Sequence, residues 1–245
     1  MSLLKGLKPE GVKVEKPKDI LGGGGTRPAG VSLFTIKSAY FLKADSGALG
    51  FHLKAVDEDG SEYRESLYVT SGDAKGNKST YTDRNGNEQF LPGFNVVNAI
   101  CLMTVGTELG EDLELEDATL KHYSKDAGSE VATEVDLVPD MIGEKVYLAI
   151  KHTIKNKQVD VAGKWVDTVD KRESNDIAAV FHAETEQTVN EAEAEQEAEF
   201  KGKWEAKYTG KPFDSYREPK GSPAKGNSVT SSGGGTEKKK SMFKK

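Results

Sequence analysis

The sequence predicts a mainly β protein, on three observations. Apolar and polar residues alternate in several stretches from residue 31 onward, which indicates strands. A helical pattern behind Pro92 interrupts these strands, and a dense acidic helical pattern follows the last of them. The chain has 245 residues, 36% hydrophobic and 30% charged, so we expect one domain of ordinary to large size with long appendages.

The composition divides the chain into four parts. Residues 1–30 are rich in Lys, Pro and Gly and are expected to form a flexible arm, and residues 31–185 the β domain. Residues 186–208 are expected to form an acidic helix. Residues 209–245, dominated by Pro, Gly, Ser and Lys, predict a disordered basic tail.

The β domain begins with three predicted strands, at residues 31–43, 50–56 and 62–69. Asp59-Gly60 lies between the second and the third and favours a hairpin turn. Three consecutive antiparallel strands of this kind form a meander.

Residues 80–90 predict a further hairpin, which leads into a helix at residues 93–104. Asn85-Gly86 is typical of a two-residue type I′ turn. Tyr81, Arg84 and Phe90 place rings and a cation on the hairpin, so we expect a mobile arm that holds nucleic acid.

The second half of the domain adds the remaining strands. Residues 115–125 are ambiguous between strand and loop, 138–143 predict one helical turn, and 144–154 form the strongest strand pattern of the chain. A hairpin near Gly163 and a last strand at 176–182 follow, and then a helix over 188–208. A meander, an interposed helix and further strands are compatible with the OB-fold, a five-stranded Greek-key barrel, here with extra hairpins and a C-terminal acidic helix.

The sequence lacks the minimum parts of common catalytic sites. The four histidines lie far apart without metalloprotease spacing, no serine-hydrolase elbow occurs, and the glycine run 22–25 has no phosphate-loop ending. Cys101 is the single cysteine and is expected to be a buried filler. We therefore expect a protein that is not an enzyme, with no cofactor and no metal site, and with no membrane span because no run approaches about 18 apolar residues.

Charge is unevenly distributed. The net charge is −6, yet residues 217–245 hold eight cationic side chains against two glutamates, so this tail carries +6 and the rest of the chain −12. Much of the negative charge lies in residues 108–117 and 184–199. The local sign of a surface decides what it binds more than the sum does.

Strands that interleave rings with cations favour the binding of single-stranded nucleic acid, since rings stack on bases and cations contact phosphates. The stacking candidates are Tyr40, Tyr63, Tyr68, Tyr81, Phe90, Tyr147 and Trp165. The phosphate-contact candidates are Lys37, Lys43, Arg64, Lys78, Arg84, Lys145, Lys151, Lys155 and Arg172.

Three stretches carry a resemblance to a known family. Residues 91–100, residues 171–185 and Thr188-Val189 resemble the single-stranded DNA-binding proteins of tailed bacteriophages, and the likeness covers about residues 30–208. It implies an OB-fold protein that coats and protects DNA without sequence preference during phage replication, recombination and repair, in the cytoplasm of the bacterial host. Single-stranded DNA is the expected partner, with duplex DNA, phage replication proteins and further copies along the DNA as additional ones.

The chain departs from that family at its end. Many members end in an acidic, aromatic-tipped tail that docks partners, whereas this tail is basic; its relevant residues are Lys238, Lys239, Lys240, Phe243, Lys244 and Lys245. We hypothesise that the acidic stretch 184–199 attracts this tail instead. The alternative function is a virion structural or assembly protein whose basic tail contacts the packaged genome, and a metal-dependent nuclease is third.

Overall fold

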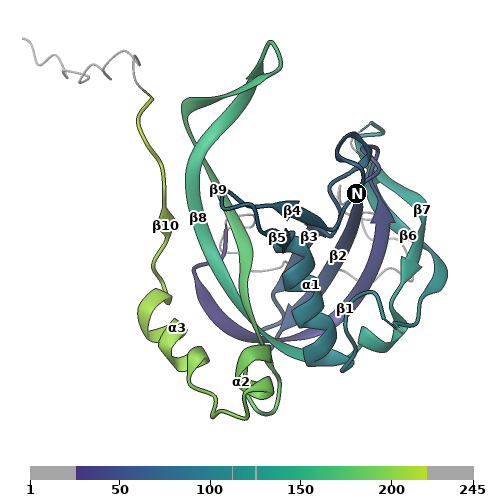
Figure 1. The fold of residues 1–245 in the computed structure, drawn as a ribbon, viewed down its shortest axis with the longest axis vertical. Coiled ribbons are helices and arrows are strands. Elements are labelled where there is room, and N and C mark those ends of the chain that lie inside the picture. The colour runs from purple at the N-terminus through teal and green to yellow at the C-terminus, as the bar shows by residue number, and fades with distance from the viewer. Residues whose placement is uncertain (1–25, 112, 125, 220–245) are drawn as a thin grey trace, which may run out of the picture.

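The computed structural model describes residues 26–111, 113–124 and 126–219, and within them the protein is mainly β. A large sheet, antiparallel apart from one short strand, curls around a helix, and a small two-stranded sheet lies beside it (Figure 1). The predicted arm over residues 1–25 and the tail residues Lys238 to Lys245 lie outside the described residues.

The first three strands form the predicted meander. β1 spans Gly30–Lys43, β2 Leu49–Asp57 and β3 Glu62–Tyr68, with β1 paired to β2 and β2 to β3. At the turn between β2 and β3 the amide of Gly60 donates to the carbonyl of Asp57 at 3.0 Å. Gly60 has φ of 81°, the left-handed conformation that glycine adopts without cost.

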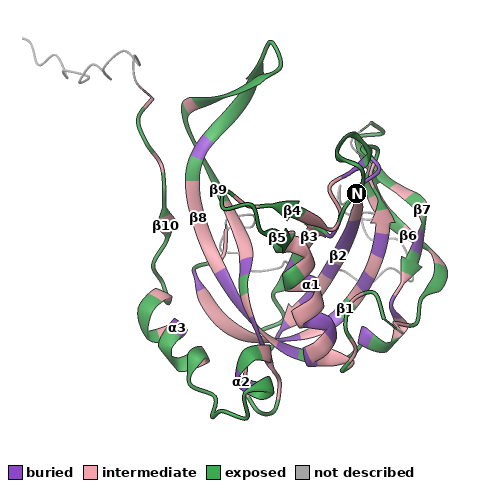
Figure 2. Cartoon of the chain, viewed as in Figure 1, coloured by how far each residue is buried: buried purple, intermediate pink, exposed green. Residues whose placement is uncertain are grey.

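Two long strands continue the sheet on the other side of β1. β8 spans Lys145–Val161 and β9 Lys164–His182. The strand predicted at 144–154, the hairpin near Gly163 and the last strand at 176–182 therefore belong to one long hairpin. Ala162 and Gly163 turn it, with φ of 53° and 80°, as a type I′ turn requires. The distal part of this hairpin, residues 156–169, projects from the body as an arm and is largely exposed (Figures 1 and 2).

A second hairpin adjoins the end of β1. β6, Glu116–Ser124, pairs with β7, Ser129–Leu137, which settles the ambiguous stretch as a strand. β7 reaches the large sheet only where Tyr40 and Phe41 pair with its last residues. The one-turn helix Pro139–Met141 then leads into β8, as predicted.

Helix α1, Pro92–Thr104, lies inside the curl of the sheet (Figure 1). Val97, Ile100 and Cys101 are fully buried and pack with Phe34 and Phe51 of the strands. Burial raises the pKa of the Cys101 thiol to about 12, so the residue is a core filler, as expected. The stripe of apolar residues on α1 is what the curled sheet buries.

The sheet is not closed, so the expected barrel is not confirmed. β3 and β9, the outer strands of the order β3-β2-β1-β8-β9, have no backbone pairing with each other. A side chain spans the seam instead: the Glu65 carboxylate accepts from the amide of Ile177 on β9 at 3.0 Å and from the Tyr63 hydroxyl at 2.6 Å. α1 packs against both strands and covers the seam from inside.

Residues 26–29, expected to be flexible, cross the same seam. The Arg27 guanidinium forms an ion pair with Asp57 at the end of β2 and lies over the ring of Phe34. Its backbone exchanges two hydrogen bonds with the side chain of Asn175 on β9. The predicted flexible arm is therefore wrong for these residues.

The acidic stretch forms two short helices rather than the one predicted over 186–208. α2 spans Val189–Glu193 and α3 Phe200–Tyr208, with Glu195 in a left-handed conformation between them. The buried Glu191 carboxylate caps both: it bonds the amide of Thr188 and the amides of Glu199 and Phe200. These hydrogen bonds satisfy amides at the starts of both helices, which is why one helix divides into two.

The tail is also ordered further than predicted. Phe213–Asp214 forms β10, parallel to β8, and the amide and carbonyl of Arg217 both bond the side chain of Asn156. Residues 209–219 therefore follow the edge of β8 that β1 leaves unpaired, and they brace the base of the arm.

The hairpin at residues 80–90 has a different turn from the predicted one. β4 is Thr80–Thr82 and β5 is Glu88–Phe90, and Gly86 has positive φ whereas Asn85 does not. The Asp83 carboxylate accepts from the amides of Asn85 and Asn87 and holds a wider loop. The one-turn helix Asp73–Lys75 precedes this hairpin. In the described residues no helix is long and apolar enough to span a bilayer.

Gly93→Ala should destabilise the protein, because α1 begins directly against the end of β3. A Cβ at Gly93 would lie 2.3 Å from the carbonyl oxygen of Tyr68, so backbone must move. We expect a loss of about 1 to 3 kcal/mol in the free energy of unfolding, measured with urea.

Gly202→Ala in α3 is the matched control, since a Cβ there meets nothing within 4 Å. That variant should be neutral or more stable by about 0.5 to 1 kcal/mol, as alanine favours helices. Equal effects of the two substitutions would contradict the packing of α1 on β3.

Candidate nucleic-acid interface

The face of β1, β2 and β3 that points away from α1, here called the outward face, carries the rings and cations in register. Tyr40 lies opposite His52, which lies opposite Ser66, and the next row holds Ser38, Lys54 and Arg64. Residues directly opposite in an antiparallel ladder are neighbours on the same face. Strand pairing alone therefore brings a ring row and a cation row side by side.

The β6–β7 hairpin lies across this face and turns it into a groove of about 460 Å³. The residues that line the groove include Tyr40, His52, Lys54, Arg64, Glu65 and Ser66 from β1–β3, and Lys121, His122, Tyr123 and Glu130 from β6–β7. This space is called the groove.

The rings in the groove contact one another. The rings of Tyr40 and His52 are stacked, with centroids 5.0 Å apart, and His122 meets His52 edge-on at 4.8 Å. The Tyr40 hydroxyl is hydrogen-bonded to His122 Nδ1 at 2.9 Å. Tyr123, beside this cluster, is 61% exposed and presents a free ring to solvent.

Tyr68 extends the cluster beyond the groove. A Cβ at Gly50 would meet the rings of His52 and Tyr68 at 3.2 and 3.4 Å, so both rings lie over the bare backbone of Gly50. Tyr68 is 51% exposed. Its ring, like that of Tyr123, is accessible to a ligand.

Burial sets the protonation of the cluster. It lowers the pKa of His52 to about 4, and the nearby His122 adds to the shift. Burial also raises the pKa of Tyr40, so both groups are neutral near pH 7. Tyr40 and His52 thus give the floor of the groove an uncharged aromatic surface.

The cations stand around this floor. Lys54 and Arg64 both bind the carboxylate of Glu62, the lysine at 2.7 Å, and these hydrogen bonds lower the pKa of Glu62. Lys121 comes from β6, and Glu130 opposes it in charge. An anionic ligand would therefore compete with Glu62 for two of the three cations.

The other predicted contacts lie on separate elements. Lys78, Tyr81, Arg84 and Phe90 belong to the β4–β5 region, where Phe90 stacks on Phe94 at 4.4 Å. Lys155, Trp165 and Arg172 belong to the β8–β9 hairpin, and Trp165 is 70% exposed. Lys37 is exposed at the bulge of β1, and Lys145 is exposed at the start of β8.

Three predicted contacts are covered, wholly or in part, by other parts of the chain. Tyr63 is 7% exposed in the core and donates to Glu65, so its ring cannot stack on a base. Tyr147 packs beneath α3, where Lys201 Nζ lies 4.1 Å from its ring centroid. Lys151 lies over the ring of Phe213 at 5.5 Å.

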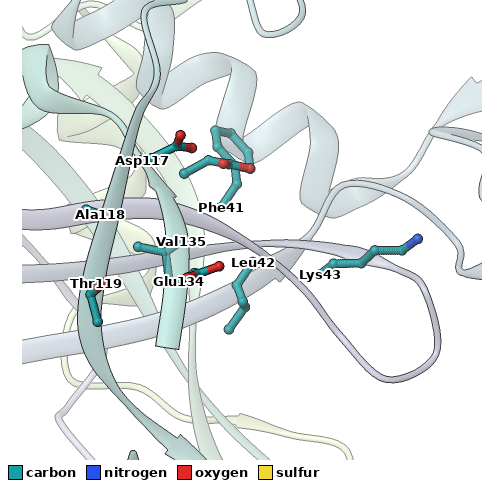
Figure 3. A pocket seen from close by; sticks show the side chains of 9 residues that line it. Phe41, Leu42, Lys43, Asp117, Ala118, Thr119, Glu134 and Val135 are labelled. Carbon is teal, nitrogen blue, oxygen red and sulfur yellow. The ribbon is translucent and has the colours of Figure 1, made fainter. Parts of the chain in front are cut away.

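Lys43 lies at a second pocket that is acidic. Figure 3 shows Lys43 with Phe41 and Leu42 on β1, and Asp117 and Glu134 on the β6–β7 hairpin. Asp117 is paired directly opposite Asp136, which also lines the pocket. Carboxylates in this density repel phosphate, so the pocket does not extend the groove.

Sequence reasoning missed five members of the site: His52, Lys54, Lys121, His122 and Tyr123. The histidines were interpreted singly, and residues 115–125 were not assigned to a strand. The available signal was a lysine followed by two rings, Lys121-His122-Tyr123, at the end of the stretch that was ambiguous between strand and loop.

The described residues contain no group of three or more His, Cys, Asp or Glu side chains placed to hold a metal ion. No known protein-family model matches the chain, and no curated protein matches it significantly.

His52→Gln should make stability less sensitive to acid. In the folded protein His52 stays neutral to about pH 4, whereas in the unfolded chain it titrates near pH 6.5. Its depressed pKa therefore costs stability as pH falls from 6.5 to 4, about 1 to 2 kcal/mol after discounting for solvent. Urea unfolding at several pH values should show a smaller loss for the variant, and identical pH profiles would contradict the burial of this ring.

Proposed function

We propose that the chain is a single-stranded DNA-binding protein that holds the strand in the groove, without catalysis and without sequence preference. The observation that carries this is the union, in one groove, of four rings with three cations: Tyr40, His52, His122, Tyr123, Lys54, Arg64 and Lys121. Every base has a ring face, so stacking tolerates any sequence, and cations add phosphate contacts.

The framework supports the proposal. We infer an OB-type arrangement. In chain order the five strands are β1, β2, β3, β8 and β9, helix α1 comes between the third and the fourth, and the sheet has an open seam between β3 and β9. OB-folds are partly open five-stranded barrels that bind oligonucleotides on the face of their second and third strands. In this chain β2 and β3 supply His52, Lys54 and Arg64.

The dimensions of the groove favour a single strand over a duplex. Its space of about 460 Å³ suits bases that enter one at a time, and its floor consists of rings. In a duplex the base faces are stacked on each other and unavailable to such a floor. The role in phage replication, recombination and repair, and in the host cytoplasm, is part of this proposal and follows from the family resemblance.

Tyr123→Ala should weaken binding of a short oligothymidylate roughly 5- to 150-fold, because a stacked base contributes about 1 to 3 kcal/mol. Tyr123→Phe keeps the ring and should bind within about 2-fold of the wild type. Fluorescence anisotropy measures both. Equal binding by the alanine and phenylalanine variants would contradict stacking at Tyr123.

Glu62→Gln should tighten binding, since it frees Lys54 and Arg64 and removes a negative charge beside the strand. At low salt the gain should be about 2- to 5-fold and should shrink as salt rises. Glu197→Gln, on the segment between α2 and α3, makes the same charge change outside the groove. If that control tightens binding equally, overall charge is responsible and the groove is not.

A further inference from the structure

The tip of the β8–β9 arm exposes apolar side chains that the body of the protein does not cover. Val159 lies opposite Val166, and Val161 opposite Lys164, so these four share one face, here called the valine face. Val159 is 39% exposed, Val166 48% and Val161 55%. Trp165 lies opposite Asp160, on the other face of the arm.

Such a face has a physical cost. A two-stranded ribbon with no layer behind it gains little from exposed valines, and clustered exposed apolar residues mark interaction surfaces. Lys164 is the one charged residue among the four, so the valine face is apolar and positive.

An apolar pocket of about 280 Å³ elsewhere on the same chain complements the valine face, since it is apolar and carries negative charge. It lies beside the first turn of α1 and is lined by side chains that include Leu49, Val69, Phe94, Leu109 and Leu113. The charged residues of its lining are Glu111 and Asp136, and both are exposed.

We propose that the valine face of one copy docks into this pocket of a second copy, with Lys164 against Glu111 and Asp136. The inference rests on the proposed function, because the strand is what holds two copies side by side. The arm projects from the body (Figure 1), so its tip can meet a neighbouring molecule. Arm and pocket are different surfaces, so the contact is head-to-tail and can repeat along a strand.

The contact is expected to be weak because it is small. A hairpin tip in a small pocket buries far less than the roughly 1,600 Å² of a standard interface. Copies bound side by side on one strand, however, meet at effective concentrations of about a millimolar. The protein should therefore be monomeric in dilute solution and bind long strands cooperatively.

A charge swap on the full-length chain tests the contact. Binding is measured on the shortest oligothymidylate that holds one copy and on one about four times longer. For the wild type we expect at least about 10-fold tighter binding per copy on the longer strand. Lys164→Glu and Glu111→Lys should each abolish most of that gain, while the double variant, whose net charge equals that of the wild type, should restore it.

Several outcomes separate the possibilities. If the double variant is no better than either single one, or the single ones keep the gain, the docking is wrong. Trp165→Ala, on the opposite face, should leave the gain unchanged; if it alone abolishes the gain, the tryptophan face makes the contact and the proposal fails. No binding of the short strand by the wild type would refute the proposed function instead, and zero-length carbodiimide cross-linking of concentrated protein, with a Lys164–Glu111 link between copies expected, would still decide the docking.

Discussion

The open seam between β3 and β9 is the constraint on which the rest of the structure depends. No backbone ladder joins these strands, and the seam is held by the half-buried Glu65 carboxylate, which reaches the amide of Ile177, and by Arg27 between Asp57 and Asn175. Burial raises the pKa of Glu65, because the partly desolvated position disfavours the charged carboxylate. The hydrogen bonds from Tyr63 and Ile177 offset this cost. With the seam held and α1 inside, the outward face keeps its curvature.

That outward face is divided between two uses. On the first half of β1, and on the same side of the neighbouring β8, α3 covers the sheet, with Trp204 and Tyr147 in the contact. Over the second half of β1 and over β2 and β3 it is left to the β6–β7 hairpin, which leaves the groove between the layers. The C-terminal helices therefore confine the accessible rings and cations to one region, and the proposed strand-binding site follows from what they leave uncovered.

Local patterns predicted the β1–β3 meander and α1 well, but they missed β7 and did not show which faces other elements cover. The alternation in residues 31–43, 50–56 and 62–69 and the stripe on α1 were sufficient because each element buries one face. Tyr63 was misplaced because it points into the core, to the opposite face of β3 from Arg64 and Tyr68. Tyr147 was misplaced because α3 covers its face, which periodicity does not reveal. Glu191 is a second residue whose burial the local pattern did not predict. Its acidic neighbours indicate a solvated helix, yet its carboxylate is buried because it accepts hydrogen bonds from the backbone amides of two helix starts.

Photocross-linking tests the central claim, that the groove holds the strand, most directly. A 5-iododeoxyuridine oligonucleotide bound to the full-length protein would be irradiated, and the modified peptides identified by mass spectrometry. We expect adducts on Tyr40, His52, Tyr68, His122 or Tyr123. Adducts confined to Tyr81, Phe90 and Trp165, with the groove residues unmodified, would contradict it.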